Sequence, residues 1–170
     1  MRRATAVLGA LALVIGSASL MAQAKPSFAG TWTLQQPEGG GGGGGRGGGR
    51  GGGRGGGFGG GAFACGQECT IAQDANTLTV TRTMGENTVS AKYMLDGSAS
   101  SNTSGRGGEV TVVSKAVWEG NNLVITTTLP NGGEAKATLS MADGMMTVAT
   151  TRPGRGGGDP VTTTQTYKKN

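Results

Sequence analysis

Few residues of this sequence could carry acid–base or nucleophilic chemistry. Histidine is absent, which removes the usual near-neutral acid/base group, His-activated nucleophiles and imidazole metal ligands. The carboxylates stand mostly where turns are expected, as at Asp96, Glu119, Glu134 and Asp143, and no two of them form a recognisable catalytic pair. We therefore expect a protein that is not an enzyme and that holds no metal ion and no cofactor. An enzyme that uses carboxylates or a redox-active cysteine pair is the third-ranked alternative.

The only two cysteines, Cys65 and Cys69, lie in the sequence Cys-Gly-Gln-Glu-Cys. In an exported chain this pair favours a disulfide, which would fasten the end of a glycine-rich tract to the strand that follows. The spacing is not Cys-x-x-Cys and no second ligand pair exists, which argues against a redox pair and against a metal site. Free thiols are the alternative, because so short a loop strains the bridge.

Two arginines are in phase with apolar residues of expected strands. Arg82 falls on the same face of its expected strand as Leu78 and Val80, and Arg152 falls on the same face as Val148. If the alternation holds, both guanidinium groups point to the apolar side, where an unpaired charge is unfavourable and a carboxylate partner is favourable.

This phase predicts a site for an anionic or amphipathic ligand. Arg82 and Arg152 would lie near the charged group of the ligand, and Tyr93 and Trp118 would form part of the wall of the site. The alternative is that each arginine stands at a strand end and reaches water at the rim. A further alternative is a barrel that is filled by its own side chains and has no ligand cavity.

These residues belong to segments in which apolar and polar residues alternate with a period of two, and which are rich in Thr and Val. About nine strands are expected, at 29–34, 70–73, 77–84, 89–95, 110–118, 123–129, 135–141, 146–152 and 161–167. The turns Gly120-Asn121, Asn131-Gly132 and Asp143-Gly144 favour hairpins between neighbours. We therefore predict an all-β fold, a single up-and-down antiparallel barrel of about eight to nine strands, because closure removes exposed edges. An open sheet or a two-layer sandwich is the alternative.

Glycine makes up 36 of the 170 residues, and aromatic residues only 4%, so the core is expected to be modest. Residues 39–61 are almost entirely glycine, with arginines at Arg46, Arg50 and Arg54. Such a tract has little apolar surface and much backbone entropy to lose, so we expect a disordered insertion after the first strand. Residues 98–108 are expected to be a similar, shorter loop.

The arginines of this tract suggest two roles. Its composition is similar to that of RNA-binding Arg-Gly-Gly segments, but export argues against a nucleic-acid partner. Weak, salt-sensitive contact of Arg46, Arg50 and Arg54 with anionic envelope polymers is the interaction we expect. The alternative is an inert, solvated insertion whose charges preserve solubility.

The N-terminus has the three parts of a secretory signal. Arg2 and Arg3 precede an apolar stretch over 4–20, and small residues follow at Ala22 and Ala24. We predict a signal peptide over 1–24 and a mature domain over 25–170, located in the periplasm or outside the cell. The apolar stretch is short for a bilayer span, so the processed protein is not expected to be an integral membrane protein, with an uncleaved anchor as the alternative.

The segment 28–32, Phe-Ala-Gly-Thr-Trp, resembles the Gly-x-Trp first-strand signature of lipocalin-like and related calycin barrels. Three further stretches resemble lipocalin-like barrels in the same way. They are Asp96-Gly97 together with Asn102-Thr103, the residues Trp118, Gly120 and Leu123, and the ending 165–169. The chain thus resembles a group of small secreted bacterial lipocalin-like proteins. The resemblance implies structural roles for Gly30 and Trp32. In such barrels the tryptophan packs across the closed end, often beside a late-strand arginine, here Arg152.

A lipocalin-like scaffold is able to hold a small molecule, although the fold by itself names none. The function expected from the sequence is non-covalent binding of a small hydrophobic or amphipathic ligand by an exported barrel. The alternative is a structural or envelope-interaction protein in which the barrel carries the Gly/Arg-rich loop.

Overall fold

The computed structural model describes residues 25–35, 62–104, 110–154 and 157–170. The strands in chain order are β1 (Gly30–Gln35), β2 (Glu68–Gln73), β3 (Thr77–Met84), β4 (Asn87–Met94), β5 (Ala99–Ser104), β6 (Val110–Glu119), β7 (Asn122–Thr128), β8 (Glu134–Ala142), β9 (Met145–Arg152) and β10 (Val161–Lys169). The predicted signal peptide over 1–24 and the Gly/Arg-rich tract over 39–61 lie outside the described residues, so both stay predictions.

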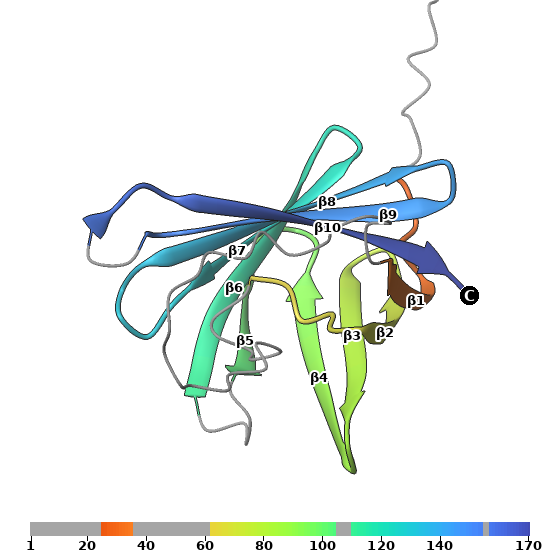
Figure 1. Cartoon of the computed structure of the whole chain (residues 1–170), viewed down its shortest axis with the longest axis horizontal. Coiled ribbons are helices and arrows are strands. Elements are labelled where there is room, and N and C mark those ends of the chain that lie inside the picture. Colours follow the sequence, from red (N-terminus) through yellow and green to blue (C-terminus); the bar gives the residue numbers. More distant parts are fainter. Residues whose placement is uncertain (1–24, 36–61, 105–109, 155–156) are drawn as a thin grey trace, which may run out of the picture.

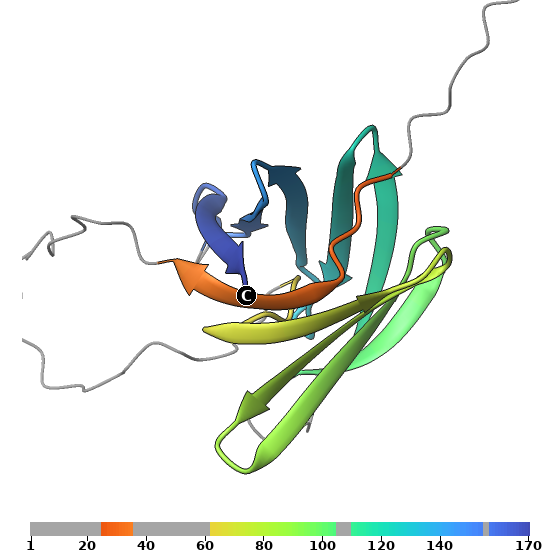
Figure 2. The same ribbon diagram turned by 90° about the vertical axis from the view of Figure 1, so that its right-hand side faces the viewer.

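All ten strands belong to one sheet with the order β4-β3-β2-β1-β10-β9-β8-β7-β6-β5. Every neighbouring pair is antiparallel, and the first and last strands pair with each other, with Trp32 opposite Lys169. The sheet curls into a nearly closed barrel, and the C-terminus ends beside β1 (Figures 1 and 2). The predicted all-β, up-and-down architecture is confirmed.

The strand count of eight to nine was wrong, because the sheet has ten strands. The additional strand is β5, which falls inside the stretch 98–108 that we expected to be a loop. Its sequence, Ala-Ser-Ser-Asn-Thr-Ser, has no apolar alternation. The strand forms because it pairs with β6 along its whole length and because its inward side chains bond to β4.

The two end strands of the sheet, β4 and β5, are joined by side chains instead of a backbone ladder. The Lys92 N–H donates to Asn102 Oδ1 at 2.7 Å, and Asn102 Nδ2 donates to the Lys92 carbonyl at 2.9 Å. Next to this pair, the Met94 N–H donates to Ser100 Oγ at 3.0 Å. These bonds occupy backbone groups that a free edge would leave open to another chain.

The inward faces of the strands form the core. Core residues that are at most 4% exposed include Leu78, Val80, Ala91, Tyr93, Ala116, Leu123, Ile125, Ala135, Ala137, Leu139, Met146, Val148 and Tyr167. The same alternation that predicted the strands therefore also selected the buried face. Among the described residues, no helix is long and apolar enough to span a bilayer.

Candidate functional site

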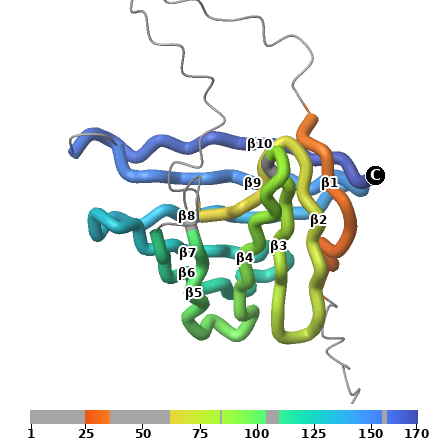
Figure 3. The backbone as a smooth tube through the Cα atoms, turned by 90° about the horizontal axis from the view of Figure 1, so that it is seen from below, coloured from red at the N-terminus to blue at the C-terminus, as the bar shows by residue number. Residues whose placement is uncertain are grey.

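A short segment without regular structure, Ala62–Gly66, lies against the inner wall of the barrel just before β2, and we call it the plug segment. Ala62 is 1% exposed, Phe63 8% and Cys65 9%. The ring of Phe63 is stacked near that of Tyr93, with 6.4 Å between centroids. The segment runs from the side of β7 to the start of β2 (Figure 3). The chain thus places part of itself inside its own barrel.

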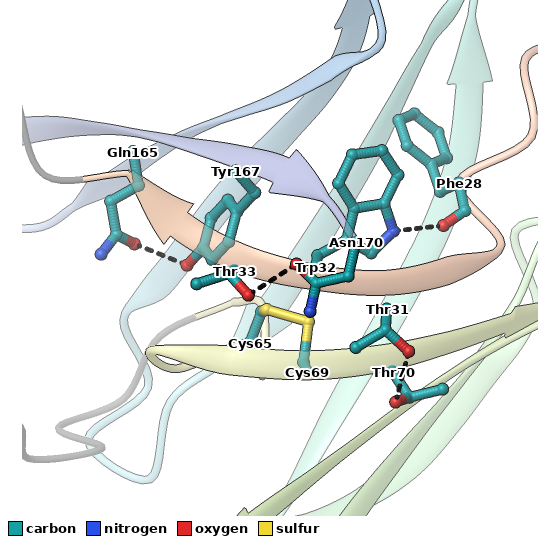
Figure 4. Close-up of a disulfide and its surroundings, with 10 residues drawn as sticks. All are labelled: Phe28, Thr31, Trp32, Thr33, Cys65, Cys69, Thr70, Gln165, Tyr167 and Asn170. Atoms are coloured by element: carbon teal, nitrogen blue, oxygen red, sulfur yellow. Dashed lines mark hydrogen bonds between the residues drawn. A yellow bond between two sulfur atoms is a disulfide. The ribbon is translucent and has the colours of Figure 1, made fainter.

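The disulfide predicted between Cys65 and Cys69 is present, with 5.3 Å between the Cα atoms. Cys69 lies on β2, opposite Trp32 of β1, and Figure 4 shows the bridge beside these two strands. The bridge therefore fastens the plug segment to the barrel wall, as the sequence led us to expect.

Polar groups gather where the plug segment meets β4, β6 and β7. The carbonyl of Ala62 accepts hydrogen bonds from the Tyr93 hydroxyl and from Thr127 Oγ1, both at 3.4 Å. The nearby Ala64 backbone lowers the pKa of Tyr93, against the effect of burial, and Ser114 Oγ lies 2.8 Å from Thr127 Oγ1. All these side chains are buried. We call Arg82, Tyr93, Ser114 and Thr127 the inner polar cluster.

Arg82 is the charged member of this cluster. Its side chain is 6% exposed on the inner face of β3, and its Nη1 would lie 3.5 Å from a Cβ placed on Gly66. Burial lowers the pKa of Arg82 to about 10, and its electrostatic interaction with Tyr93 opposes this shift. The guanidinium therefore still carries its charge at neutral pH. The inward orientation predicted for Arg82 is what the structure shows.

Of the four residues expected to contact a ligand, Arg82 and Tyr93 are both buried on the inner face of the barrel and interact electrostatically. Trp118 lies beside the β6–β7 turn, whereas Arg82 lies near the β3–β4 turn, and these turns are at opposite ends of an up-and-down barrel. Arg152 is the last residue of β9 and is exposed. Its position fits the alternative reading, in which an arginine at a strand end reaches water.

Trp118 belongs to a different cluster, which also contains residues from the start of the described chain. Its ring is stacked on that of Phe28, with 5.9 Å between centroids, and Lys25 Nζ lies 5.7 Å from the Trp118 ring centroid. The same Lys25 ammonium donates to the carbonyl of Gly120 at 2.7 Å. Trp118 therefore packs the N-terminal segment onto the β6–β7 turn.

Trp32 is fully buried, and its Nε1 donates to the Phe28 carbonyl at 2.8 Å (Figure 4). The cation beside its ring is Lys169, with Nζ 5.8 Å from the ring centroid, and not the Arg152 suggested by the resemblance. Gly30 has a φ of 139°, and a Cβ there would collide with the Lys169 side chain. The structure thus shows a packing role for both Gly30 and Trp32.

Ser114, Thr127 and the plug segment are the site components that we did not predict from the sequence. Ser114 and Thr127 occupy inward positions of β6 and β7, in phase with Ala116 and Ile125. Their inward phase is readable from the sequence, but the phase alone does not indicate which hydrogen-bond partners they meet. The contacts of the plug segment had no local signal apart from the cysteine pair.

The exposed carboxylates of Asp74 and Asp96 accept hydrogen bonds from neighbouring residues of their turns. The Thr77 hydroxyl and nearby backbone N–H groups hold the pKa of Asp74 below its usual value. Ser98 does the same for the pKa of Asp96, mainly through its hydroxyl. Within the described ranges, no group of three or more His, Cys, Asp or Glu residues could hold a metal ion.

The only two tyrosines of the chain, Tyr93 and Tyr167, are both buried. Burial raises the pKa of Tyr167 to about 12 and raises that of Tyr93 as well. Because an unfolded tyrosine has a pKa of about 10, the folded state holds more tyrosine protons above that pH. These two groups therefore make stability fall as pH rises past about 10, while the lowered pKa of Arg82 contributes the opposite slope.

We expect tyrosinate absorbance to appear together with the loss of β-sheet circular dichroism in an alkaline titration. Tyr93→Phe and Tyr167→Phe variants, each with one tyrosine, assign the signal. Tyrosine ionisation near pH 10 with the circular dichroism unchanged would contradict the burial of these hydroxyls.

The chain matches no protein-family model and no curated protein. Among solved structures it is similar to the REP1-NXSQ fatty acid transporter, with a TM-score of 0.53, 13% identity, and coverage of 84% of this chain and 95% of that one. A variant of the fluorescent protein UnaG gives a TM-score of 0.53 at 17% identity, covering 84% and 96%. A tyrosine variant of the transporter gives 0.52 at 12%, covering 84% and 97%. At these identities the likeness shows a shared antiparallel β-barrel fold.

Proposed function

We propose that the barrel binds a small amphipathic carboxylic acid non-covalently, with its charged head group facing Arg82 and its apolar part among the inward side chains. The observation that carries this proposal is the position of Arg82, a charged guanidinium that is 6% exposed on the inner face of the barrel. A guanidinium carries five N–H donors in a planar fork, which matches the two oxygens of a carboxylate.

The surroundings of Arg82 support this choice of ligand. The Tyr93 hydroxyl interacts electrostatically with Arg82 and meets the Thr127 hydroxyl in the barrel interior, and both hydroxyls can donate to a carboxylate oxygen. The rest of the inner face is mostly aliphatic, as sites for apolar ligands generally are. The barrel fold is shared with a protein whose name describes it as a fatty acid transporter.

The test is a titration with cis-parinaric acid, a fluorescent fatty acid, and with its uncharged methyl ester. We expect Arg82→Met to weaken binding of the acid by about tenfold to a hundredfold, the usual worth of a hydrogen bond to a charged group. Binding of the ester should not change, because it lacks the negative charge.

The matched control is Arg152→Met, the same substitution at an exposed arginine of the same barrel. This variant should bind the acid as the unmodified protein does. Equal affinities of the Arg82→Met and Arg152→Met variants for the acid would rule out the proposed role of Arg82.

A further inference from the structure

We infer that the plug segment, Ala62–Gly66, is a built-in competitor of the ligand, and that the Cys65–Cys69 disulfide holds it in place. This inference rests on the proposed function. Binding of the carboxylic acid then displaces the plug segment from the inner polar cluster, and the disulfide determines how readily this displacement occurs.

The plug segment occupies the hydrogen-bond donors that a carboxylate head group would use. The Tyr93 and Thr127 hydroxyls converge on one carbonyl oxygen, that of Ala62. A hydroxyl has a single proton to donate, so neither group can serve the Ala62 carbonyl and a ligand oxygen at full strength. The Ala62 carbonyl thus stands where a ligand oxygen would be bound.

The plug segment also covers the apolar surface that a ligand would cover. Phe63 is 8% exposed and its ring is stacked near that of Tyr93, while Ala62 is 1% exposed within the core. The apolar part of a ligand bound beside Tyr93 would cover the surface that Phe63 now covers. The plug segment therefore resembles an amphipathic ligand, with a polar oxygen and an apolar ring.

The disulfide is the main tether of the plug segment to the barrel wall. The segment has no strand or helix of its own, and β2 begins only at Glu68. The disulfide ties Cys65 directly to β2, so Ala62 is three residues from a covalent anchor instead of six. A shorter tether raises the effective concentration of the segment at the inner polar cluster.

The experiment compares cis-parinaric acid binding to the unmodified full chain and to the Cys65→Ser/Cys69→Ser double variant. If the plugged state is favoured by about ten to one, its release raises the apparent affinity about tenfold. Phe63→Ala should raise affinity in the same direction, because it weakens the competitor without changing the inner polar cluster. Gln67→Ala, an exposed position in the same loop, is the control and should have no effect.

A second measurement needs no variant. In the plugged state the Ala64 backbone lies close enough to the Tyr93 oxygen to lower the pKa of Tyr93. Displacement of the plug segment by saturating cis-parinaric acid should therefore accelerate hydrogen exchange at the Ala64 amide. Exchange that stays slow at saturation would overturn the competition.

The outcomes separate this inference from the proposed function. Weaker or unchanged binding by the double-serine and Phe63→Ala variants, with Arg82→Met still impaired, overturns the competition alone and makes the plug segment part of the site wall. No binding by any of the proteins, the double-serine variant included, overturns the proposed function together with the competition.

Discussion

Replacing Trp32 with alanine is expected to lower the free energy of unfolding by about 3–5 kcal/mol, the usual range for a buried tryptophan. Trp32 is fully buried, and the change removes both its ring and the hydrogen bond from Nε1 to the Phe28 carbonyl at 2.8 Å. The cavity that remains lies where β1 meets both β2 and β10. Urea denaturation followed by circular dichroism measures the loss.

Two further variants assign this effect. Trp32→Phe keeps a ring but loses the Nε1 donor, so a loss of about 1 kcal/mol is expected from the hydrogen bond, besides any change in packing. Trp118→Ala removes the other tryptophan, which is only partly buried, and should cost less than Trp32→Ala. Equal losses for the two alanine variants would show that Trp32 is not the dominant packing residue at this junction.

Replacing Asn102 with alanine is expected to lower the free energy of unfolding by about 2–4 kcal/mol, because the change leaves two backbone groups without their partner. The Asn102 amide accepts from the Lys92 N–H and donates to the Lys92 carbonyl, and it is 7% exposed. The same variant should speed hydrogen exchange at the Lys92 amide. Chemical denaturation and exchange together test whether the β4–β5 junction closes through this side chain.

The control for this prediction is the neighbouring residue of the same strand. Thr103 is exposed on the outer face of β5, so Thr103→Ala should change stability by no more than about 0.5 kcal/mol. If the Asn102→Ala and Thr103→Ala variants unfolded at the same urea concentration, the side-chain closure of the barrel would be refuted.

The sequence by itself determined the all-β fold and which side of most strands is buried. Alternation in the strands 77–84 and 135–141 is a local property, because neighbouring side chains of a strand point to opposite faces. Short turns such as Asp143-Gly144 then make consecutive strands antiparallel neighbours. The same local rule placed Arg82 inward, and the presence of a single cysteine pair in a chain expected to be exported favoured the Cys65–Cys69 disulfide that the structure shows.

Only the tertiary structure decided which polar residues work together. β5 forms because it pairs with β6 and because Asn102 and Ser100 accept hydrogen bonds from β4, and Arg152 faces water because β9 ends there. The Ala62 carbonyl meets hydroxyls that lie 31 and 65 residues further along the chain, on β4 and β7. The physical reason is range: alternation and turns act between neighbours, whereas these hydrogen bonds exist only after the sheet has closed and has brought distant strands to one interior.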